Sequence, residues 1–313
     1  MFTRTVDRSR EERKETIVSA CDLFGVSRQV YYRSKSSLTR SRGKASQVVA
    51  MVHQVRRQLP RLGTRKLYYL LEDRLKALGV GRDRLFSILK ANHLLIKPAR
   101  SYRKTTDSHH RFHKHKNLVA ELVPTQPEQV WVADITYIGN RENQQYLALV
   151  TDAYSKKIVG HDVSENLSSD GAIRALKQGL KSRSYKANTL IHHSDRGLQY
   201  CCDAYQQILT RKKVRCSMTE SYDPYTNAVA ERVNGILKQE FMLEDYRVEL
   251  PVMQQLVKDS IEIYNTKRPH WSCHMLTPEQ MHKQQTIKIK SYKKTDRFKA
   301  SFETVSESIN LVL

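Results

Sequence analysis

Cysteine and tryptophan are scarce in this chain, and the cysteines follow no disulfide or metal-binding pattern. The 313 residues include 5 Cys and 2 Trp. The cysteines are odd in number and none are spaced as C-x-x-C; they are Cys21, Cys201, Cys202, Cys216 and Cys273. A disulfide framework and a zinc ribbon are therefore excluded, and the composition favours a protein of the reducing cytosol.

Long apolar runs are also missing. No stretch approaches the roughly 18 consecutive apolar residues that a membrane-spanning helix needs. The N-terminal segment MFTRTVDRSREERKET is charged and lacks an apolar core, so we expect no secretory signal. Hydrophobic residues nevertheless make up 39% of the chain, which is enough for a true core and argues against wholesale disorder. The length suggests about two domains, or three small ones.

Acidic residues are too few to balance the basic ones, and the imbalance is local. The chain has 54 Lys and Arg against 32 Asp and Glu, a net charge of +22. Residues 1–118 carry a net charge of +19, residues 119–282 of −1 and residues 283–313 of +4. A solvated basic face is the plainest explanation of such a run. The asymmetry instead favours a polyanionic partner, with nucleic acid ahead of an anionic membrane surface.

Helical patterns fill the basic N-terminal region. A capping-box pattern at Ser9 and Glu12 predicts a helix over residues 9–22, Gly25 ends it, and Ser27 can cap a second short helix, SRQVYYRS. This layout predicts a helix-turn-helix DNA-binding segment over residues 1–45. Helices at 46–59, 64–78 and 82–93 predict a second basic helical domain over residues 46–96. The side chains expected to contact DNA are Arg28, Gln29, Tyr32, Arg33, Arg65, Lys66, Arg82 and Arg84.

Two basic segments show no helical or strand periodicity. Residues 97–124 are predicted to form a linker, and residues 283–313 a C-terminal tail. The linker holds four histidines, His109, His110, His113 and His115. Because no cysteine or second histidine pair lies at zinc-finger spacing, a tether that follows phosphates is favoured over a metal site.

Residues 125–282 show the strand and helix patterns of an α/β domain. VWVADITYI, YLALVTDAY and KIVGHDV are three β-rich runs joined by short polar turns. Helical and strand patterns then alternate, adding two strands and ending in two helices near 226–244 and 251–265. The expected fold is a mixed five-stranded sheet with flanking helices, preceded by an all-α region.

Three acids of this domain form a candidate site. Asp134 lies inside the first strand, Asp195 follows the strand TLIHH, and Glu231 lies on the helix NAVAERVNGILKQE. Each has a plain structural explanation: a turn partner, a helix cap, or a surface ion pair with Arg232 or Lys238. Together, however, three carboxylates supply the oxygen ligands that two Mg²⁺ ions need for phosphodiester chemistry.

The spacing of the three acids and the sequence strings around them form a distinctive pattern. There are 60 residues between Asp134 and Asp195 and 35 between Asp195 and Glu231, within WVADITYI, HHSDRGLQY and NAVAERVNGILKQE. YNTKRPH (264–270) and LTPEQ (276–280) follow. From about residue 19 to residue 281 the chain closely resembles the DDE transposase/integrase superfamily. Within it, the closest likeness is to the OrfB-type transposases of the IS-three insertion-sequence family.

The resemblance implies an RNase-H-like core over residues 125–282 that binds two Mg²⁺ ions, or Mn²⁺, through Asp134, Asp195 and Glu231. Water or a DNA 3′-hydroxyl would attack a phosphodiester in line, without a covalent protein intermediate. A phosphate contact by Lys238 is also implied, with a plain surface lysine as the alternative. Positioning roles around the acids or the DNA are implied for His192, His193, Gln199, Tyr200 and Asn227.

The family's activity implies a bacterial, cytoplasmic, DNA-associated transposase that cleaves and transfers strands at terminal inverted repeats. The implied partners are double-stranded DNA, further copies of the chain on that DNA, and an upstream-frame OrfA-like protein or fusion. Thr226 departs from the Asp that the family often has before the glutamate. Two alternatives stay open: a binding-only helix-turn-helix regulator with an inert core, and an RNase-H-like nuclease or junction resolvase that cuts without joining.

Overall fold

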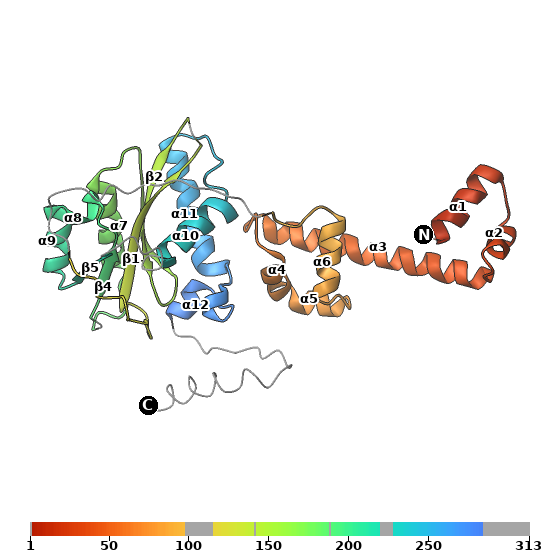
Figure 1. The fold of residues 1–313 in the computed structure, drawn as a ribbon, viewed down its shortest axis with the longest axis horizontal. Coiled ribbons are helices and arrows are strands. Elements are labelled where there is room, and N and C mark those ends of the chain that lie inside the picture. Colours follow the sequence, from red (N-terminus) through yellow and green to blue (C-terminus); the bar gives the residue numbers. More distant parts are fainter. Residues whose placement is uncertain (1, 98–114, 141, 188, 220–227, 284–313) are drawn as a thin grey trace, which may run out of the picture.

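The computed structural model describes residues 2–97, 115–140, 142–187, 189–219 and 228–283. An α/β unit lies at one end of the molecule and a helical region extends away from it (Figure 1). Most of the predicted linker and nearly all of the predicted C-terminal tail lie outside the described residues. No helix of the described part combines the length and the apolar character needed to cross a membrane.

The N-terminal region begins with α1 (Phe2–Arg13) and α2 (Ile17–Leu23). The predicted single helix over residues 9–22 is therefore wrong. Lys14 adopts a left-handed conformation with φ of 54°, which ends α1. The hydroxyl of Thr16 then accepts a hydrogen bond from the Ser19 N–H at 3.1 Å and so caps α2. The predicted stop is confirmed, because α2 ends just before Gly25, whose φ is +64°.

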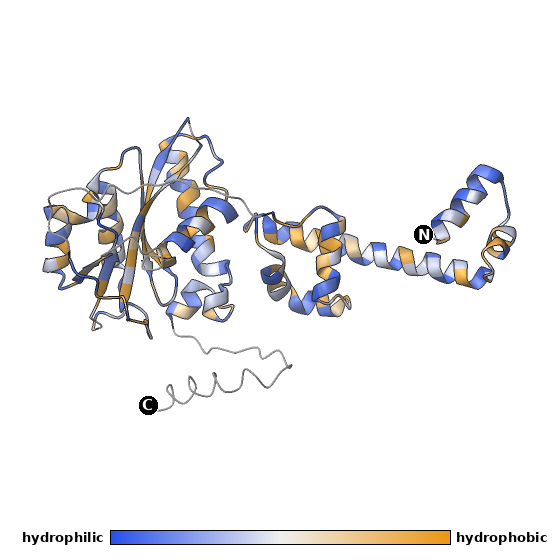
Figure 2. Ribbon diagram, viewed as in Figure 1, coloured by the Kyte–Doolittle hydropathy of each residue, from blue (hydrophilic) through white to orange (hydrophobic). Residues whose placement is uncertain are grey.

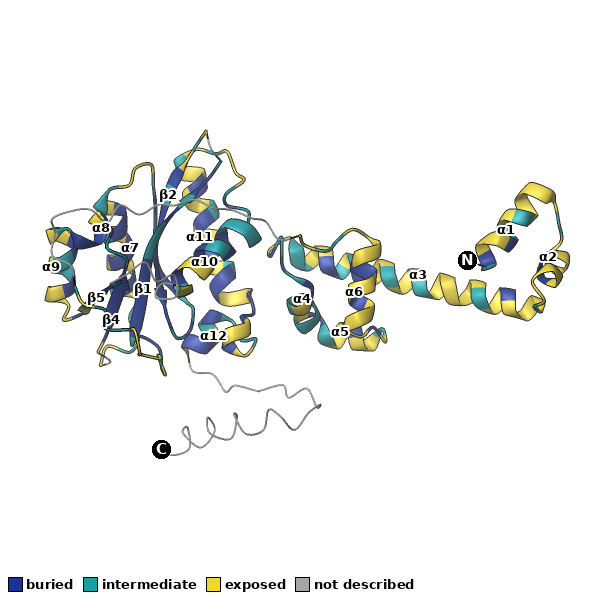
Figure 3. Cartoon of the chain, viewed as in Figure 1, coloured by how far each residue is buried: buried dark blue, intermediate teal, exposed yellow. Residues whose placement is uncertain are grey.

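The next helix, α3 (Arg28–Arg56), is 29 residues long. It begins after Ser27 as expected, but it replaces both the short predicted helix and the one predicted at 46–59. The boundary drawn between residues 45 and 46 falls inside it. The intervening residues include one glycine, Gly43, and no proline, so nothing there forces the helix to end. This middle stretch of α3 is largely exposed (Figure 3).

Three short helices complete the N-terminal region. The helix predicted at 64–78 is divided at Leu71 into α4 (Thr64–Leu70) and α5 (Glu72–Ala77), and α6 (Arg82–Ala91) follows. The apolar core of this group includes Val52, Leu67, Leu75 and Leu89, all fully buried. The expected all-α region is confirmed.

The α/β unit is built on a five-stranded mixed sheet with the order β3-β2-β1-β4-β5. The strands are β1 (Val130–Ile138), β2 (Gln145–Asp152), β3 (Ile158–Ser164), β4 (Ile191–Ser194) and β5 (Arg215–Met218). The first three form an antiparallel meander, whereas β4 and β5 run parallel to β1. The predicted RNase-H-like sheet is confirmed.

Helices cover both faces of the sheet (Figures 1 and 2). On one face, Trp131 and Ala133 belong to an apolar cluster with α7 (Ser169–Lys181), α8 (Leu198–Cys201) and α9 (Asp203–Arg211). On the other face lie α10 (Ala228–Glu240) and α11 (Leu250–Lys267). Gly160 of β3 lets α7 approach closely, because a Cβ there would lie 2.0 Å from the Ala175 carbonyl oxygen.

The segment YNTKRPH ties the end of α11 to the rest of the unit. The Asn265 side chain bonds both the N–H and the C=O of Ile158, at 3.0 and 2.9 Å. Arg268, only 1% exposed, donates two hydrogen bonds to the Glu240 carboxylate at 2.8 and 2.7 Å. The chain closes with η1 (Trp271–Cys273) and α12 (Pro278–His282), which Thr277 of the LTPEQ string caps. The segment thus fixes the start of β3 and the end of α10.

Removing the Glu240 carboxylate should destabilise the fold strongly. Glu240→Ala leaves the buried Arg268 guanidinium without its counter-ion, which costs about 3–5 kcal/mol of unfolding free energy. Urea denaturation measures the loss. Glu142→Ala is the matched control, since its pair with Arg247 is 66% and 70% exposed and should contribute about 0–1 kcal/mol. Equal losses in the two variants would contradict this account of the buried pair.

Candidate active site

Asp134 and Asp195 lie at corresponding points on two neighbouring strands. Parallel pairing of β1 with β4 ends at Ala133 opposite Ser194. The next residue on each strand is one of the two acids. Beyond this point the strands separate, and both acids line one cavity of about 230 Å³. The register of two strands therefore brings together two carboxylates that are far apart in the sequence.

The Asp134 carboxylate is held from both sides. Asn234 Nδ2 of α10 donates to its Oδ2 at 2.7 Å, and the Ile135 N–H donates to its Oδ1 at 3.0 Å. The pKa of Asp134 is raised to about 8, mainly by burial and also by the charges of Asp195 and Glu231. The two hydrogen bonds lower it by less. A metal-free site therefore favours the protonated acid near neutral pH.

The face of α10 that carries Asn234 also carries Glu231 and Lys238. Glu231 lies one turn earlier, in the exposed first turn of the helix. Lys238 lies one turn later, and its Nζ donates to Thr136 Oγ1 at 3.5 Å. Glu231 is close enough to raise the pKa of Asp134. All three predicted acids are thus neighbours, and Lys238 reaches the same strand two residues beyond Asp134.

The donor set suits a hard divalent cation. It consists of carboxylate oxygens, one of them on a partly buried strand where a charge needs compensation. Across the described residues, no group of three or more His, Cys, Asp and Glu side chains is close enough to hold a metal ion. The three acids are therefore neighbours rather than a closed ligand set, and the segment before Glu231, residues 220–227, lies outside the described part.

Gly197 keeps the loop after Asp195 tight. Its N–H donates to Asp195 Oδ1 at 3.0 Å. A Cβ at Gly197 would lie 2.9 Å from that same oxygen, closer than real Cβ atoms come. Any larger residue would therefore push the carboxylate out of place, which explains why glycine stands in the string HHSDRGLQY.

The residues expected to support the acids divide into two groups. His192 and His193 lie in the buried sheet, where burial lowers their pKa values to about 3 and about 4. They hydrogen bond to Tyr205 and Ser217, at 2.8 and 2.9 Å, and these bonds do not reach the acids. Gln199 and Tyr200 do line the cavity with Asp134 and Asp195. Asn227 lies outside the described residues.

Most side chains expected to contact DNA are exposed on the helical region. They are Arg28, Gln29, Tyr32 and Arg33 on α3, Arg65 on α4, and Arg82 and Arg84 on α6. Lys66 differs from them. Its ammonium pairs with Glu240 at 3.5 Å, and burial, together with the nearby Arg268, lowers its pKa to about 8. The Lys66 side chain therefore joins α4 to the end of α10.

Several side chains at the site were not identified from sequence. One of them is Asn234, although its position three residues after Glu231 on the helix places it on the same face as that acid. Thr136 shares a strand face with Asp134 and meets Lys238. Tyr137 and Tyr146 are paired across β1 and β2 and line the cavity.

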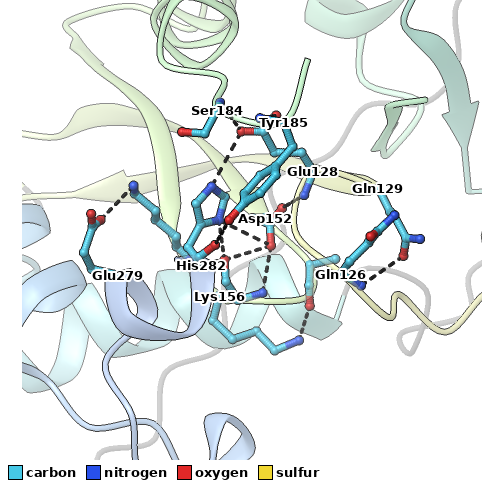
Figure 4. Close-up of polar contacts among 12 residues, drawn as sticks. Gln126, Glu128, Gln129, Asp152, Lys156, Ser184, Tyr185, Glu279 and His282 are labelled. Atoms are coloured by element: carbon cyan, nitrogen blue, oxygen red, sulfur yellow. Dashed lines mark hydrogen bonds and ion pairs between the residues drawn. The ribbon is translucent and has the colours of Figure 1, made fainter. Parts of the chain in front are cut away.

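A second polar cluster surrounds Asp152, which is paired with Trp131 near the start of β1 (Figure 4). The Asp152 carboxylate accepts from the Glu128 and Ser155 N–H groups, both at 2.7 Å, and Ser155 Oγ meets His282 Nδ1 at 2.9 Å. Burial acts to raise the pKa of Glu128, but hydrogen bonds from His282, the Ser184 and Tyr185 N–H groups and Arg183 lower it to about 2. This cluster fastens α12 to the sheet.

Part of the chain is similar to known integrases. The family described as "Integrase core domain" matches residues 124–224, and a second family of the same description matches residues 212–278. The catalytic core domain of the HTLV-2 integrase, solved in complex with magnesium, is similar at 18% identity and a TM-score of 0.40, covering 50% of this chain and 98% of that one. A chain of the simian T-cell lymphotropic virus intasome gives 17% identity and a TM-score of 0.43, over 75% and 79%.

Similarity to curated proteins extends over more of the chain. The insertion element IS600 uncharacterized 31 kDa protein of Shigella sonnei is 35% identical over 265 residues, 82% of this chain and 95% of the relative. The transposase InsF for insertion sequence IS3fB of Escherichia coli (strain K12) is 32% identical over 218 residues, 68% and 75% of the two chains. The chain therefore belongs to the IS3-type insertion-sequence transposases, polynucleotidyl transferases with an integrase core.

Proposed function

We propose that Asp134, Asp195 and Glu231 are the catalytic carboxylates and hold two Mg²⁺ ions. The observation that carries this proposal is the Asp134 carboxyl, whose pKa is raised to about 8 by burial and by the two neighbouring acids. Such a group is costly to ionise unless a cation compensates it. The integrase-core family depends on divalent metal; the number of ions, the choice of Mg²⁺ and the ligands are our assignment.

The chain's own residues orient this site. Asn234 and the Ile135 N–H fix the two oxygens of Asp134, and the Gly197 N–H fixes Asp195. Lys238, whose Nζ lies 3.5 Å from Thr136 Oγ1, supplies a positive charge for a DNA phosphate. When bound, the ions activate the attacking oxygen and neutralise the leaving one at the phosphodiester. The reaction is strand cleavage followed by strand transfer at terminal inverted repeats.

The basic helical region is proposed to hold the DNA. Exposed arginines on α3, α4 and α6 present charge to phosphates, and Arg61, Arg65 and Lys97 line a cavity of about 450 Å³ between α4, α6 and the end of α10. The proposed division is a helix-turn-helix segment, a second helical domain and the catalytic core. Joining two element ends requires further copies of the chain on DNA, and an upstream-frame OrfA-like protein is a proposed partner.

Asp195→Asn should abolish product formation. The protein is incubated with Mg²⁺ and a labelled duplex carrying the element's terminal repeat, and cleaved and joined strands are separated on a gel. We expect a loss of at least about a hundredfold, since a missing ligand removes transition-state charge stabilisation. Asp203→Asn, an exposed acid at the start of α9, is the control and should match wild type.

Unchanged products in Asp195→Asn would overturn the assignment of the acids. Cutting without joining by the wild-type protein would instead indicate a nuclease or resolvase, and repeat binding without any metal-dependent product would indicate a binding-only regulator.

Asp134→Asn should change how stability depends on pH. In EDTA, the native state holds the Asp134 proton to a pKa of about 8, against 3.8 for an ordinary Asp carboxyl. The native state therefore binds more protons between these values, and the contribution of Asp134 to unfolding free energy falls as pH rises from about 4 to 8. Across this range, wild type should lose at least about 1 kcal/mol of unfolding free energy relative to the variant. A pKa difference of one unit corresponds to about 1.4 kcal/mol.

Urea denaturation at each pH, with and without Mg²⁺, measures this difference. Mg²⁺ should raise the stability of wild type at pH 8 and leave Asp134→Asn unaffected. A pH-independent difference between the two proteins would contradict the raised pKa.

Arg28→Ala with Arg33→Ala should weaken DNA binding in a salt-dependent way. If each arginine neutralises one phosphate, the slope of log K against log salt should lose about 0.9 per contact. Fluorescence anisotropy with the repeat duplex at several salt concentrations gives the slope. Arg8→Ala is the control, because Arg8 is equally exposed but already paired with Glu12 in α1. An unchanged slope in the double variant would show that this face of α3 does not contact the phosphates of the DNA.

A further inference from the structure

The cavity that Asp134 and Asp195 line also has aromatic and aliphatic side chains, for which the proposed metal chemistry gives no role. Its volume is about 230 Å³. Tyr137 and Tyr146 face each other across β1 and β2, with ring centroids 5.0 Å apart. Leu167 and Leu198, 37% and 44% exposed, lie on the helical side of the same cavity.

Without a bound cation, the side chains of this lining do not favour a phosphate as the occupant. No Lys, Arg or His contributes to the lining among the described residues, and the two charged groups are acids. The lining therefore holds a phosphate only at the acids and through bound cations, and the wall away from the acids offers an anion no positive charge. Flat aromatic rings with apolar neighbours instead suit a neutral planar group.

The lining also holds unused hydrogen-bonding capacity. Tyr200 is 3% exposed, and its hydroxyl has no hydrogen-bond partner among the described residues. Burial raises its pKa well above the ordinary value, so it keeps its proton. Gln199 lines the same cavity and its Nε2 donates to the Leu167 carbonyl at 3.1 Å, which joins α8 to the loop before α7. Buried donors without partners call for an explanation.

We propose that this cavity receives one unpaired DNA base, from a nucleotide bonded to the phosphate that is cut. The inference rests on the proposed function. A phosphodiester held against Asp134 and Asp195 brings the attached base beside the lining, but only if that base leaves its stack in the duplex. Stacking on Tyr137, paired with Tyr146, compensates for the lost stacking and works with any base, because every base has a π face.

The test removes the ring and the base in turn. Cleavage rates are measured for wild type and Tyr137→Ala, on the repeat duplex and on duplexes with an abasic site at either nucleotide that shares the cut phosphate. On intact DNA, Tyr137→Ala should be about tenfold slower, within the range for one lost stacking contact. On one of the abasic duplexes the two proteins should cut at equal rates, because the base that the ring binds is gone.

Companion variants keep this result interpretable. Tyr137→Phe retains the ring and should recover most of the rate that Tyr137→Ala loses. Leu198→Ala, which is exposed and outside the sheet, should show the same pattern as Tyr137→Ala without disturbing folding. Trp271→Ala is the control: an aromatic residue 66% exposed, next to Cys273, which bonds Ser155 at the opposite end of the sheet.

Equal slowing of Tyr137→Ala on the intact and both abasic duplexes would overturn the inference, since a purely structural ring would act on every substrate alike. So would wild-type rates for both Tyr137→Ala and Leu198→Ala on intact DNA. In either case the loss of all products in Asp195→Asn would leave the proposed function standing. Products from Asp195→Asn would count against the function itself.

Discussion

The hydrogen bond between Asn234 and Asp134 joins the central strand to the helix that carries the third acid. A carboxylate in the middle of a sheet needs compensation, and here an amide from α10 provides part of it at 2.7 Å. The same bond holds α10 against β1. Glu231 lies one turn before Asn234 on that helix. The rest of the site follows, because β4 delivers Asp195 at the point where its pairing with β1 ends.

The far end of α10 is fixed just as firmly, and by residues that first drew attention only as a sequence string. Arg268 of YNTKRPH holds Glu240 through two hydrogen bonds, and the helical region meets the same residue through Lys66 and the Arg61 N–H. One glutamate therefore connects the end of α11, α10 and α4. Strings downstream of the acids support the site by holding its helix in place, not by contributing groups to it.

Local rules predicted the sheet well and pointed to three acids that the fold brings near one another, and failed where a role depends on packing. Strand alternation and the flanking strings located Asp134, because both signals lie within a few residues of it. The break at Lys14 was missed because a left-handed lysine carries no sequence signal as plain as glycine. Lys66 looked like its exposed neighbour Arg65, and only the approach of α10 shows that it is buried. Asn234 was overlooked for the same reason, since its partner is on a strand 100 residues away.

The uneven charge of the chain takes on a different meaning in the folded structure. Within the nearly neutral core, Glu240 is paired with Arg268 and Glu128 with Arg183, so these charges cancel internally and project little field. Asp134 tends to hold a proton until a cation replaces it. The metal-free core therefore offers DNA little attraction of its own, and under the proposed function the exposed arginines of the helical region supply it. The proposed function thus assigns DNA binding and strand chemistry to different parts of the chain, and the contact of α4 with α10 joins the two parts.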